Sequence, residues 1–286
     1  MKFRRSSRLV DMTNHLLLHP QHLVSLSYFA EKYDSAKSSI SEDLGIIKQT
    51  FEQQGIGTLM TVAGAAGGVK FIPMVGEEEA SEVVEELCEV IANPDRLLPG
   101  GYLYLTDILG DPRIVNKIGK IFASIYSNYD IDVVMTVATK GIPLAYAVAS
   151  YLDVPVVIVR HGNRVTEGST VSINYVSGST KRIQTMVLAK RSLKEGSNVL
   201  IIDDFMKAGG TVKGMVSILE EFNANVKGIG VLVESEGVEE RLVDEYISLV
   251  KLTDVDVKEK QIKVTVGNYE SYLKQVKFED EMGETE

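Results

Sequence analysis

The segment from Val199 to Thr211 constrains the fold more than any other part of the chain. Four apolar residues come first, Asp203 and Asp204 follow them, and a turn with two adjacent glycines comes next. A continuous apolar run is typical of a strand that is buried on both faces, as in a parallel sheet. The glycines indicate a tight strand-to-helix turn. The chain is therefore expected to contain an α/β domain with this turn at the edge of its sheet.

The same turn predicts a site for a phosphorylated sugar. Backbone N–H groups and the positive end of the following helix suit a phosphate. Asp203 and Asp204 would repel a phosphate, but their oxygens can accept hydrogen bonds from two neighbouring hydroxyl groups. A phosphate at one end and a diol at the other describe a ribose 5-phosphate. We expect it to be bound by Asp203, Asp204, Phe205, Met206, Lys207, Ala208, Gly209, Gly210 and Thr211.

Apolar runs alternate with helical patterns on either side of this segment. Strands are expected at 131–138, 154–159, 198–202 and 228–233, and helices at 142–152 and 211–222, with a further helix that begins at Asp111-Pro112. The alternation predicts a parallel sheet, and ligands of such sheets bind beyond the carboxyl ends of the strands. A second strand-to-helix junction should therefore face the first. We expect it to offer a cation and N–H donors to the far end of the ligand through Thr139, Lys140 and Gly141.

The first 75 residues predict a separate, smaller module. Their formal charge is +2, whereas the remaining residues carry −12, which gives the overall charge of −10. Helical patterns are expected over 6–18, after Ser27 as an N-cap, and over 36–51. Two short strands, 58–62 and 69–72, then surround a glycine-rich tip. Three helices and a hairpin predict a winged helix, a variant of the helix-turn-helix group that binds DNA.

The third of these helices has a face suited to a DNA groove. Its apolar residues recur every three or four positions, so short hydroxyl side chains and lysines project from the other side. Small side chains permit close approach to base edges, and cations meet the phosphates. We expect DNA contacts from Arg4, Arg5, Arg8, Lys37, Ser38, Ser41, Lys48 and Lys70. An ordinary helical module that binds protein remains the alternative.

Composition excludes several classes of protein. The net charge of −10 argues against a protein that coats nucleic acid non-specifically. The single cysteine, Cys88, cannot form an intrachain disulfide and is expected as a small core residue on the helical segment 77–92. Apolar runs such as Val154–Val159 are much shorter than the ~18 residues of a membrane span, and no secretory signal is visible. We expect a cytoplasmic protein without a membrane partner, and no metal site among its histidines.

The motif in Val199–Thr211 closely resembles the phosphoribosyl pyrophosphate (PRPP) motif of type I phosphoribosyltransferases. Together with the predicted head and the segments 98–102, 138–141 and 166–170, it makes the chain similar to the purine operon repressors of Gram-positive bacteria over about residues 1–273. The resemblance implies a winged-helix domain over 1–74 and a type I phosphoribosyltransferase-like, parallel-sheet effector domain over 75–273. Residues 274–286 are expected to form an acidic tail without fixed structure.

The resemblance also implies a function. It describes a homodimeric repressor of purine synthesis and transport genes that leaves double-stranded operator DNA when PRPP binds, with or without Mg²⁺. Tyr102 and Arg160 would flank the ligand and Lys207 would reach a phosphate, while guanosine tetraphosphate would compete for the same pocket. No catalytic residue is expected. The segment 160–182 has two interpretations, a flexible loop that closes over PRPP or a surface hairpin without ligand contact.

Two departures from the family pattern affect this interpretation. Ala208 replaces a hydroxyl residue common in the enzymes, so phosphate binding should depend more on backbone N–H groups and Lys207. His161-Gly162 stands where a charged pair is expected in the repressors, which alters loop closure. Two other functions stay open: an active purine phosphoribosyltransferase with an accessory DNA-binding head, and a non-catalytic scaffold whose head binds protein.

Overall fold

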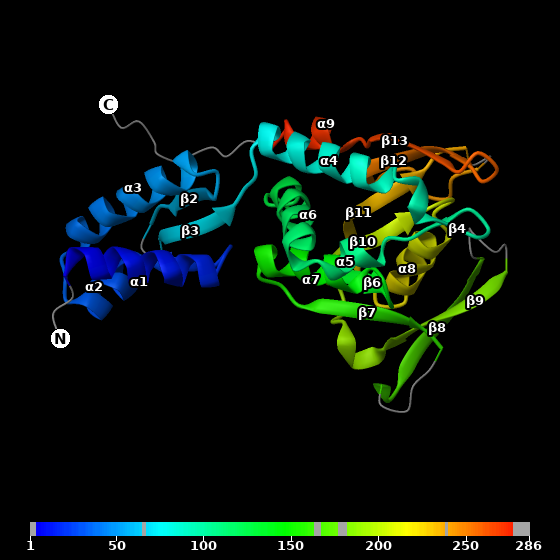
Figure 1. Ribbon diagram of the computed structural model, residues 1–286. Helices are drawn as coiled ribbons and strands as arrows, with labels where there is room; N and C mark the ends of the chain where they lie inside the picture. Colours follow the sequence, from blue (N-terminus) through cyan, green and yellow to red (C-terminus); the bar gives the residue numbers. More distant parts are fainter. Residues whose placement is uncertain (1–3, 65–66, 163–166, 177–181, 238–239, 277–286) are drawn as a thin grey trace.

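The protein is a small head joined to a larger α/β body (Figure 1). The computed structural model describes residues 4–64, 67–162, 167–176, 182–237 and 240–276. The head and the body have separate apolar cores. Within the described ranges, no helix combines the length and apolarity that crossing a lipid bilayer requires.

The head has the predicted three helices and hairpin, together with one short strand that the sequence did not reveal. Strand β3 lies between β1 and β2, and both pairings are antiparallel. The N-cap of the second helix is Ser25 and not Ser27, because the Ser25 Oγ accepts the Tyr28 N–H at 3.1 Å. The elements are α1 (Arg5–Leu18), β1 (Leu23–Ser25), α2 (Leu26–Tyr33), α3 (Lys37–Gln53), β2 (Gly57–Val62) and β3 (Gly68–Pro73).

The body is built around one large sheet flanked by helices. Its helices are α4 (Glu77–Ile91), α5 (Thr106–Gly110), α6 (Pro112–Ile125), α7 (Ile142–Leu152), α8 (Gly210–Glu220) and α9 (Tyr269–Leu273). Its large-sheet strands are β6 (Val133–Val137), β7 (Val156–His161), β8 (Thr170–Val176), β9 (Ile183–Ala189), β10 (Asn198–Met206), β11 (Asn225–Ser235), β12 (Ile247–Asp256) and β13 (Gln261–Val266). A small separate hairpin consists of β4 (Leu97–Leu98) and β5 (Tyr102–Leu103).

The strand order of the large sheet, within the described residues, is β13-β12-β11-β10-β6-β7-β9-β8. The five strands from β12 to β7 are parallel, as predicted. The sheet is mixed at its edges, where β13, β9 and β8 pair antiparallel, which the sequence did not predict. The link from β12 to β13 is a short turn, and a parallel crossover needs a dozen or more residues.

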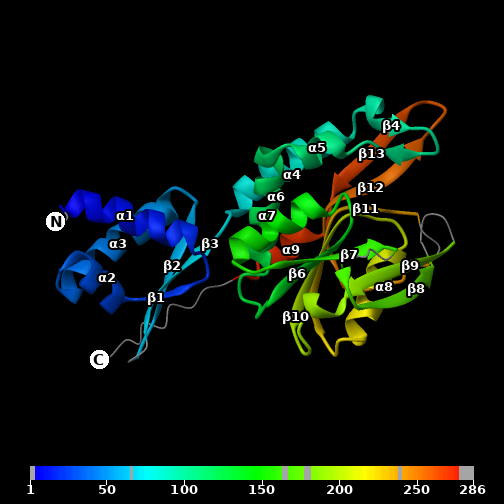
Figure 2. The same cartoon turned by 90° about the horizontal axis from the view of Figure 1, so that it is seen from below.

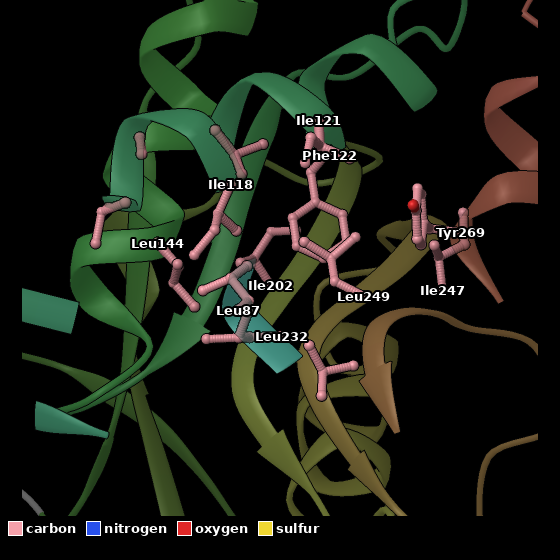
Figure 3. Close-up of a cluster of buried hydrophobic side chains, with 14 of the residues drawn as sticks. Leu87, Ile118, Ile121, Phe122, Leu144, Ile202, Leu232, Ile247, Leu249 and Tyr269 are labelled. Carbon is pink, nitrogen blue, oxygen red and sulfur yellow. The ribbon is translucent and has the colours of Figure 1, made fainter. Parts of the chain in front are cut away.

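The sheet is buried on both faces, which explains its continuous apolar strands. Leu200 and Ile202 of β10 point to one face and pack with α4, α6 and α7, whereas Val199 and Ile201 point to the other face and pack with α8. Figure 2 shows these helices on opposite sides of the sheet. Figure 3 shows the first cluster, in which side chains of α6 and α7 gather around Ile202. Cys88 packs against this cluster, as expected, and burial raises the pKa of its thiol to about 11.

Helices α6 and α7 cross at Gly119 with almost no space between them. A Cβ atom at Gly119 would lie 2.6 Å from the Ala147 Cβ and 2.8 Å from the Ala147 carbonyl carbon. Real Cβ atoms do not approach other atoms so closely, so the two helices cannot hold this distance with any other residue there.

We predict that Gly119→Ala lowers the free energy of unfolding by about 1–3 kcal/mol, because the added methyl group must push α6 from α7. Urea unfolding followed by circular dichroism measures the change. Gly45→Ala is the matched control, since Gly45 lies in α3 with nothing within 4 Å of its added Cβ. That change should raise stability by about 0.5–1 kcal/mol. Equal effects of the two substitutions would contradict the packing argument.

Candidate functional site

A cavity of about 1000 Å³ opens at the carboxyl ends of the central strands. Five separate parts of the described chain form its wall, and two of them are the predicted β10–α8 turn and the predicted loop before α7. The predicted residues that line the cavity are Tyr102, Lys140, Asp204, Phe205, Met206, Lys207, Ala208, Gly209, Gly210 and Thr211. The structure thus places both predicted junctions in one hollow.

The acidic pair lies inside the end of β10 and not beyond it, because the strand continues to Met206. Asp203 is only 3% exposed, and its Oδ1 accepts the Asp204 N–H at 3.0 Å. Burial raises the pKa of Asp203 well above its usual range, and the charge of Asp204 adds to that rise. Burial also raises the pKa of Asp204, whereas Lys140 opposes the rise. Asp204 is therefore the carboxylate that faces the cavity and Asp203 supports it from below.

The turn after β10 is held from behind by a segment that the sequence did not reveal. The Leu242 N–H donates to the Ala208 carbonyl at 2.9 Å. Gly209 has a φ of +85°, and a Cβ there would lie 3.1 Å from the Val243 side chain. Only glycine adopts this conformation without strain and leaves room for Val243. The turn thus presents its backbone to the cavity, with α8 beginning at Gly210.

The side chains along this turn have different surroundings. Lys207 is exposed at the cavity wall, so its ammonium group is available to an anion. The Met206 side chain is 2% exposed and belongs to the core beside α8, and Phe205 packs against the core on the opposite face. Contacts of Met206 with a ligand would therefore use its main chain.

The second junction approaches the acidic pair through Gly141. A Cβ at Gly141 would lie 2.2 Å from the Thr136 Oγ1 and 3.2 Å from the Asp203 Oδ1, so only glycine lets the loop come this close. Thr139 and Lys140 are exposed beside it, and Lys140 lines the cavity. The Thr136 hydroxyl is buried and has no partner among the described residues. Its position beneath the loop could not be inferred from an apolar strand pattern.

Tyr102 and Arg160 lie at different sides of the site. Tyr102 is 57% exposed on β5 and stands at the cavity wall with apolar residues of β12 and the turn after it, including Val255 and Val257. Arg160 lies near the end of β7, and its Nε lies 3.3 Å from the Glu167 Oε1. It is not among the residues that line the cavity in the described part of the chain. Arg160 as a ligand contact stays a prediction.

The segment 160–182 contains strand β8, which pairs antiparallel with β9. The hairpin packs against α8, where a Cβ on Gly214 would lie 3.0 Å from the Tyr175 ring. Residues 163–166 and 177–181, which include Arg164, Thr166 and Lys181, lie outside the described residues. Both interpretations of this segment, a closing loop and a plain hairpin, remain open.

Three of the eight predicted DNA contacts are exposed together on one helix of the head. Lys37, Ser38 and Ser41 are exposed on α3, and Arg4 is exposed before α1. Lys48 is half-buried at the far end of α3, 4.0 Å from Glu52. Lys70 is half-buried on β3, and burial lowers the pKa of its ammonium group. The face of α3 is thus open to a groove near its first turns.

Arg8 has a structural role that the sequence did not indicate. Asp43 on α3 is completely buried, and it accepts hydrogen bonds from the Arg8 Nε at 2.5 Å and from the Arg5 Nε at 2.9 Å. Arg8 is 9% exposed and also donates to the Ser35 Oγ. We therefore expect Arg8 to hold α1 against α3, whereas the more exposed Arg5 can still meet a phosphate.

Comparisons with known proteins agree with this division. A family model described as the bacterial purine repressor N-terminal domain matches residues 4–73, and the phosphoribosyl transferase domain matches residues 105–266. The chain is 68% identical over 286 residues, all of both chains, to the purine biosynthesis transcriptional repressor PurR of Bacillus subtilis strain 168. It is 49% identical over 265 residues, 93% of this chain and 98% of the other, to the purine biosynthesis transcriptional activator PurR of Lactococcus lactis subsp. lactis strain IL1403.

The body alone is similar to enzymes. Xanthine phosphoribosyltransferase of Lactococcus lactis subsp. lactis strain IL1403 is 31% identical over 149 residues, which are 51% of this chain and 76% of that one. The crystal structure of adenine phosphoribosyltransferase from Thermoanaerobacter pseudethanolicus superposes with a TM-score of 0.52 and 24% identity, over 59% of this chain and 99% of that chain. This structural likeness concerns the fold of the body.

Burial of Asp203 predicts a pH-dependent stability. Below pH 3.8 the carboxyl is neutral in both states; above it the unfolded form ionises while the folded form, whose pKa is raised, stays protonated. Stability therefore falls as the pH rises from 3.8 toward the higher folded pKa, by about 1.4 kcal/mol for each pH unit. Asp203→Asn cannot ionise, so its stability relative to the wild type should increase over this interval.

Urea unfolding at several pH values between 4 and 7.5 measures this difference. Asp244→Asn, at an exposed aspartate, controls for the loss of one negative charge. A difference between Asp203→Asn and wild type that stays constant across the interval would show that Asp203 ionises normally.

Proposed function

The chain belongs to the family of purine biosynthesis transcriptional repressors, which have a DNA-binding N-terminal domain, and on this premise we propose that PRPP is the signal that releases it from the operators of purine synthesis and transport genes. The observation that carries the proposal is the single cavity into which both strand-to-helix junctions open. One junction offers the Asp204 carboxylate and a backbone turn at the start of α8, and the other offers the ammonium group of Lys140.

PRPP has three groups that match this cavity. Its ribose diol can donate hydrogen bonds to the carboxylate of Asp204, which Asp203 supports. Its 5-phosphate suits the backbone N–H groups at the start of α8 and the ammonium group of Lys207. Its pyrophosphate suits Lys140 and the N–H groups of the loop before α7. The opposite charges of Asp204 and Lys140 thus favour a ligand that is a diol at its centre and anionic at both ends.

We propose different roles in the same cavity for Mg²⁺ and guanosine tetraphosphate. Among the described residues, no group of three acidic, histidine or cysteine side chains is placed to hold a metal ion. Mg²⁺ would therefore arrive with PRPP, held mainly by phosphate oxygens and water, as this ion prefers. Guanosine tetraphosphate also carries a ribose and two anionic groups, so it would compete for Lys140 and Lys207.

The body is proposed to bind PRPP without transferring its ribose. Relatives that match the whole chain are named regulators, whereas the xanthine phosphoribosyltransferase matches about half of it. Release from DNA needs only a difference in PRPP affinity between the DNA-bound and free arrangements. A homodimer would supply two heads for two half-sites. As a regulator of bacterial genes, the protein would act in the cytoplasm.

We predict that saturating PRPP weakens binding to a DNA fragment upstream of a purine gene by about tenfold or more, a coupling of the usual size for an allosteric regulator. Asp203→Asn with Asp204→Asn should abolish this response and leave DNA affinity without PRPP unchanged, because the pair lies in the body. Fluorescence anisotropy of labelled DNA, with PRPP affinity measured by calorimetry, gives both quantities.

Two controls separate the rival functions. Incubation with PRPP and each purine base should yield no nucleotide, and nucleotide formation at a useful rate would favour the enzyme. Wild-type protein that binds DNA equally well with and without PRPP would reject the proposed signal. Failure to bind any upstream fragment would favour the protein-binding scaffold.

The exposed cations of the head predict how DNA binding depends on salt. Lys37→Ala should weaken binding to specific and unrelated DNA alike and reduce the slope of log Kd against log salt by about 1, because one phosphate contact is lost.

Arg8→Met should instead unfold the head, since it leaves Asp43 buried with one partner fewer. We expect the free energy of unfolding to fall by about 3–5 kcal/mol. Arg8→Met protein with normal stability and a reduced salt slope would assign Arg8 to DNA.

A further inference from the structure

One short stretch of α6 in the body makes two hydrogen bonds to the chain on either side of the head's hairpin. The Lys120 Nζ donates to the Gly55 carbonyl, between α3 and β2, at 2.7 Å and lies 3.3 Å from the Glu79 Oε2 of α4. Its side chain is only 16% exposed, so water screens these contacts poorly. One turn later, the Ser124 Oγ accepts the Val75 N–H at 2.9 Å. Both contacts reach the part of the chain that enters or leaves the hairpin of the head.

The same stretch of α6 rests directly on α7. Gly119 precedes Lys120, and it is the residue at which the two helices have no space for a Cβ. A contact between backbones cannot be taken up by side-chain rotation, so a movement of α7 must move α6 at this point. The helices also share the core that contains Ile118 and Leu144 (Figure 3).

Helix α7 runs from the cavity to the head. It begins at Ile142, directly after Lys140 and Gly141 at the cavity edge. It ends before Asp153, whose Oδ2 lies 3.7 Å from the Nδ1 of His22 in the head. An anion that binds Lys140 and the first N–H groups of α7 therefore acts on an element that touches the head at its other end.

We propose that Lys120 is a positioning residue that sets the orientation of the DNA-binding head on the body, and that the contact of α6 with α7 at Gly119 makes this orientation depend on the ligand at Lys140. The inference rests on the proposed function, because it assigns the route by which that ligand acts. The route requires two orientations of the head. In one, Lys120 holds the Gly55 carbonyl, as in the structure; in the other, this contact is altered.

Helix α6 supplies a matched control for this role. Lys117 lies one turn before Lys120 and also contacts a glutamate of α4, Glu86, at 3.4 Å. Both Lys117 and Glu86 belong to the body, so this ion pair does not join the body to the head. Replacing either lysine by methionine removes one charge from the same helix and keeps most of the aliphatic stem.

The experiment uses the full chain with Lys120→Met, Lys120→Arg or Lys117→Met. The measurements are PRPP affinity by calorimetry, DNA Kd with and without PRPP, and hydrogen exchange of ligand-free protein around Gly55 and Val75. Lys120→Met should keep PRPP affinity within about twofold but reduce the effect of PRPP on DNA Kd by at least about fivefold. It should also speed exchange at Val75, whose amide is hydrogen-bonded to α6. Lys120→Arg should restore part of both effects, and Lys117→Met should match the wild type.

The outcomes separate this inference from the proposed function. A Lys120→Met chain with the wild-type response of DNA Kd to PRPP would overturn the positioning role. Wild-type protein that fails to bind PRPP would reject the proposed function. In that case hydrogen exchange of the ligand-free protein tests the role of Lys120. If the Val75 amide exchanges at the same rate in Lys120→Met as in Lys117→Met, the positioning role is overturned. Should Lys120→Met not fold, Lys120→Gln, which also removes the charge that contacts Gly55 and Glu79, replaces it in every comparison with the same expected direction.

Discussion

The parallel pairing of β10 with β6 is the constraint on which the site depends. Because Val199 lies opposite Val133 and both strands run in the same direction, the turn after each strand opens at the same edge of the sheet. The acidic pair and the cation of Lys140 are thereby brought together although they are far apart in the sequence. The same pairing starts α7 and α8 at this edge and sends them to opposite faces (Figure 2). The pairing register of β10 with β6 therefore determines both where the ligand-binding residues meet and where α7 and α8 begin.

The sequence predicted those parts of the fold that are determined by residues close together in the chain. Continuous apolar runs identified the parallel strands, and the acids and glycines after them identified both junctions of the cavity. Helix α7 begins and ends at the predicted residues, because glycine and proline mark its start. Ser25 was missed as an N-cap because Ser27, two positions later, has the same chemistry, and only the extended backbone at Ser25 separates the two.

Features that depend on a distant partner could not be predicted. Asp43 occupies a position in α3 whose sequence is typical of a polar surface, and its burial is visible only once Arg8 of α1 is placed beside it. Leu242 and Val243 contact the β10–α8 turn from a segment with no motif of its own. The antiparallel edges of the sheet were missed for a similar reason, since strand direction is decided by the length of the connection and by which neighbour is free.

The glycine at each junction limits which substitutions can change the ligand specificity of the pocket. At Gly141 and Gly209 a side chain has no space, so the groups that face an anion there are main-chain atoms, the same whatever residue is encoded elsewhere. Substitutions that retain Lys140, Asp204 and Lys207 can therefore alter the ligand preference of the pocket chiefly through the part of its wall that includes Tyr102 and Val257. Evolution or laboratory selection for a different signal molecule would conserve the two anion-binding junctions and change the residues around Tyr102 and Val257.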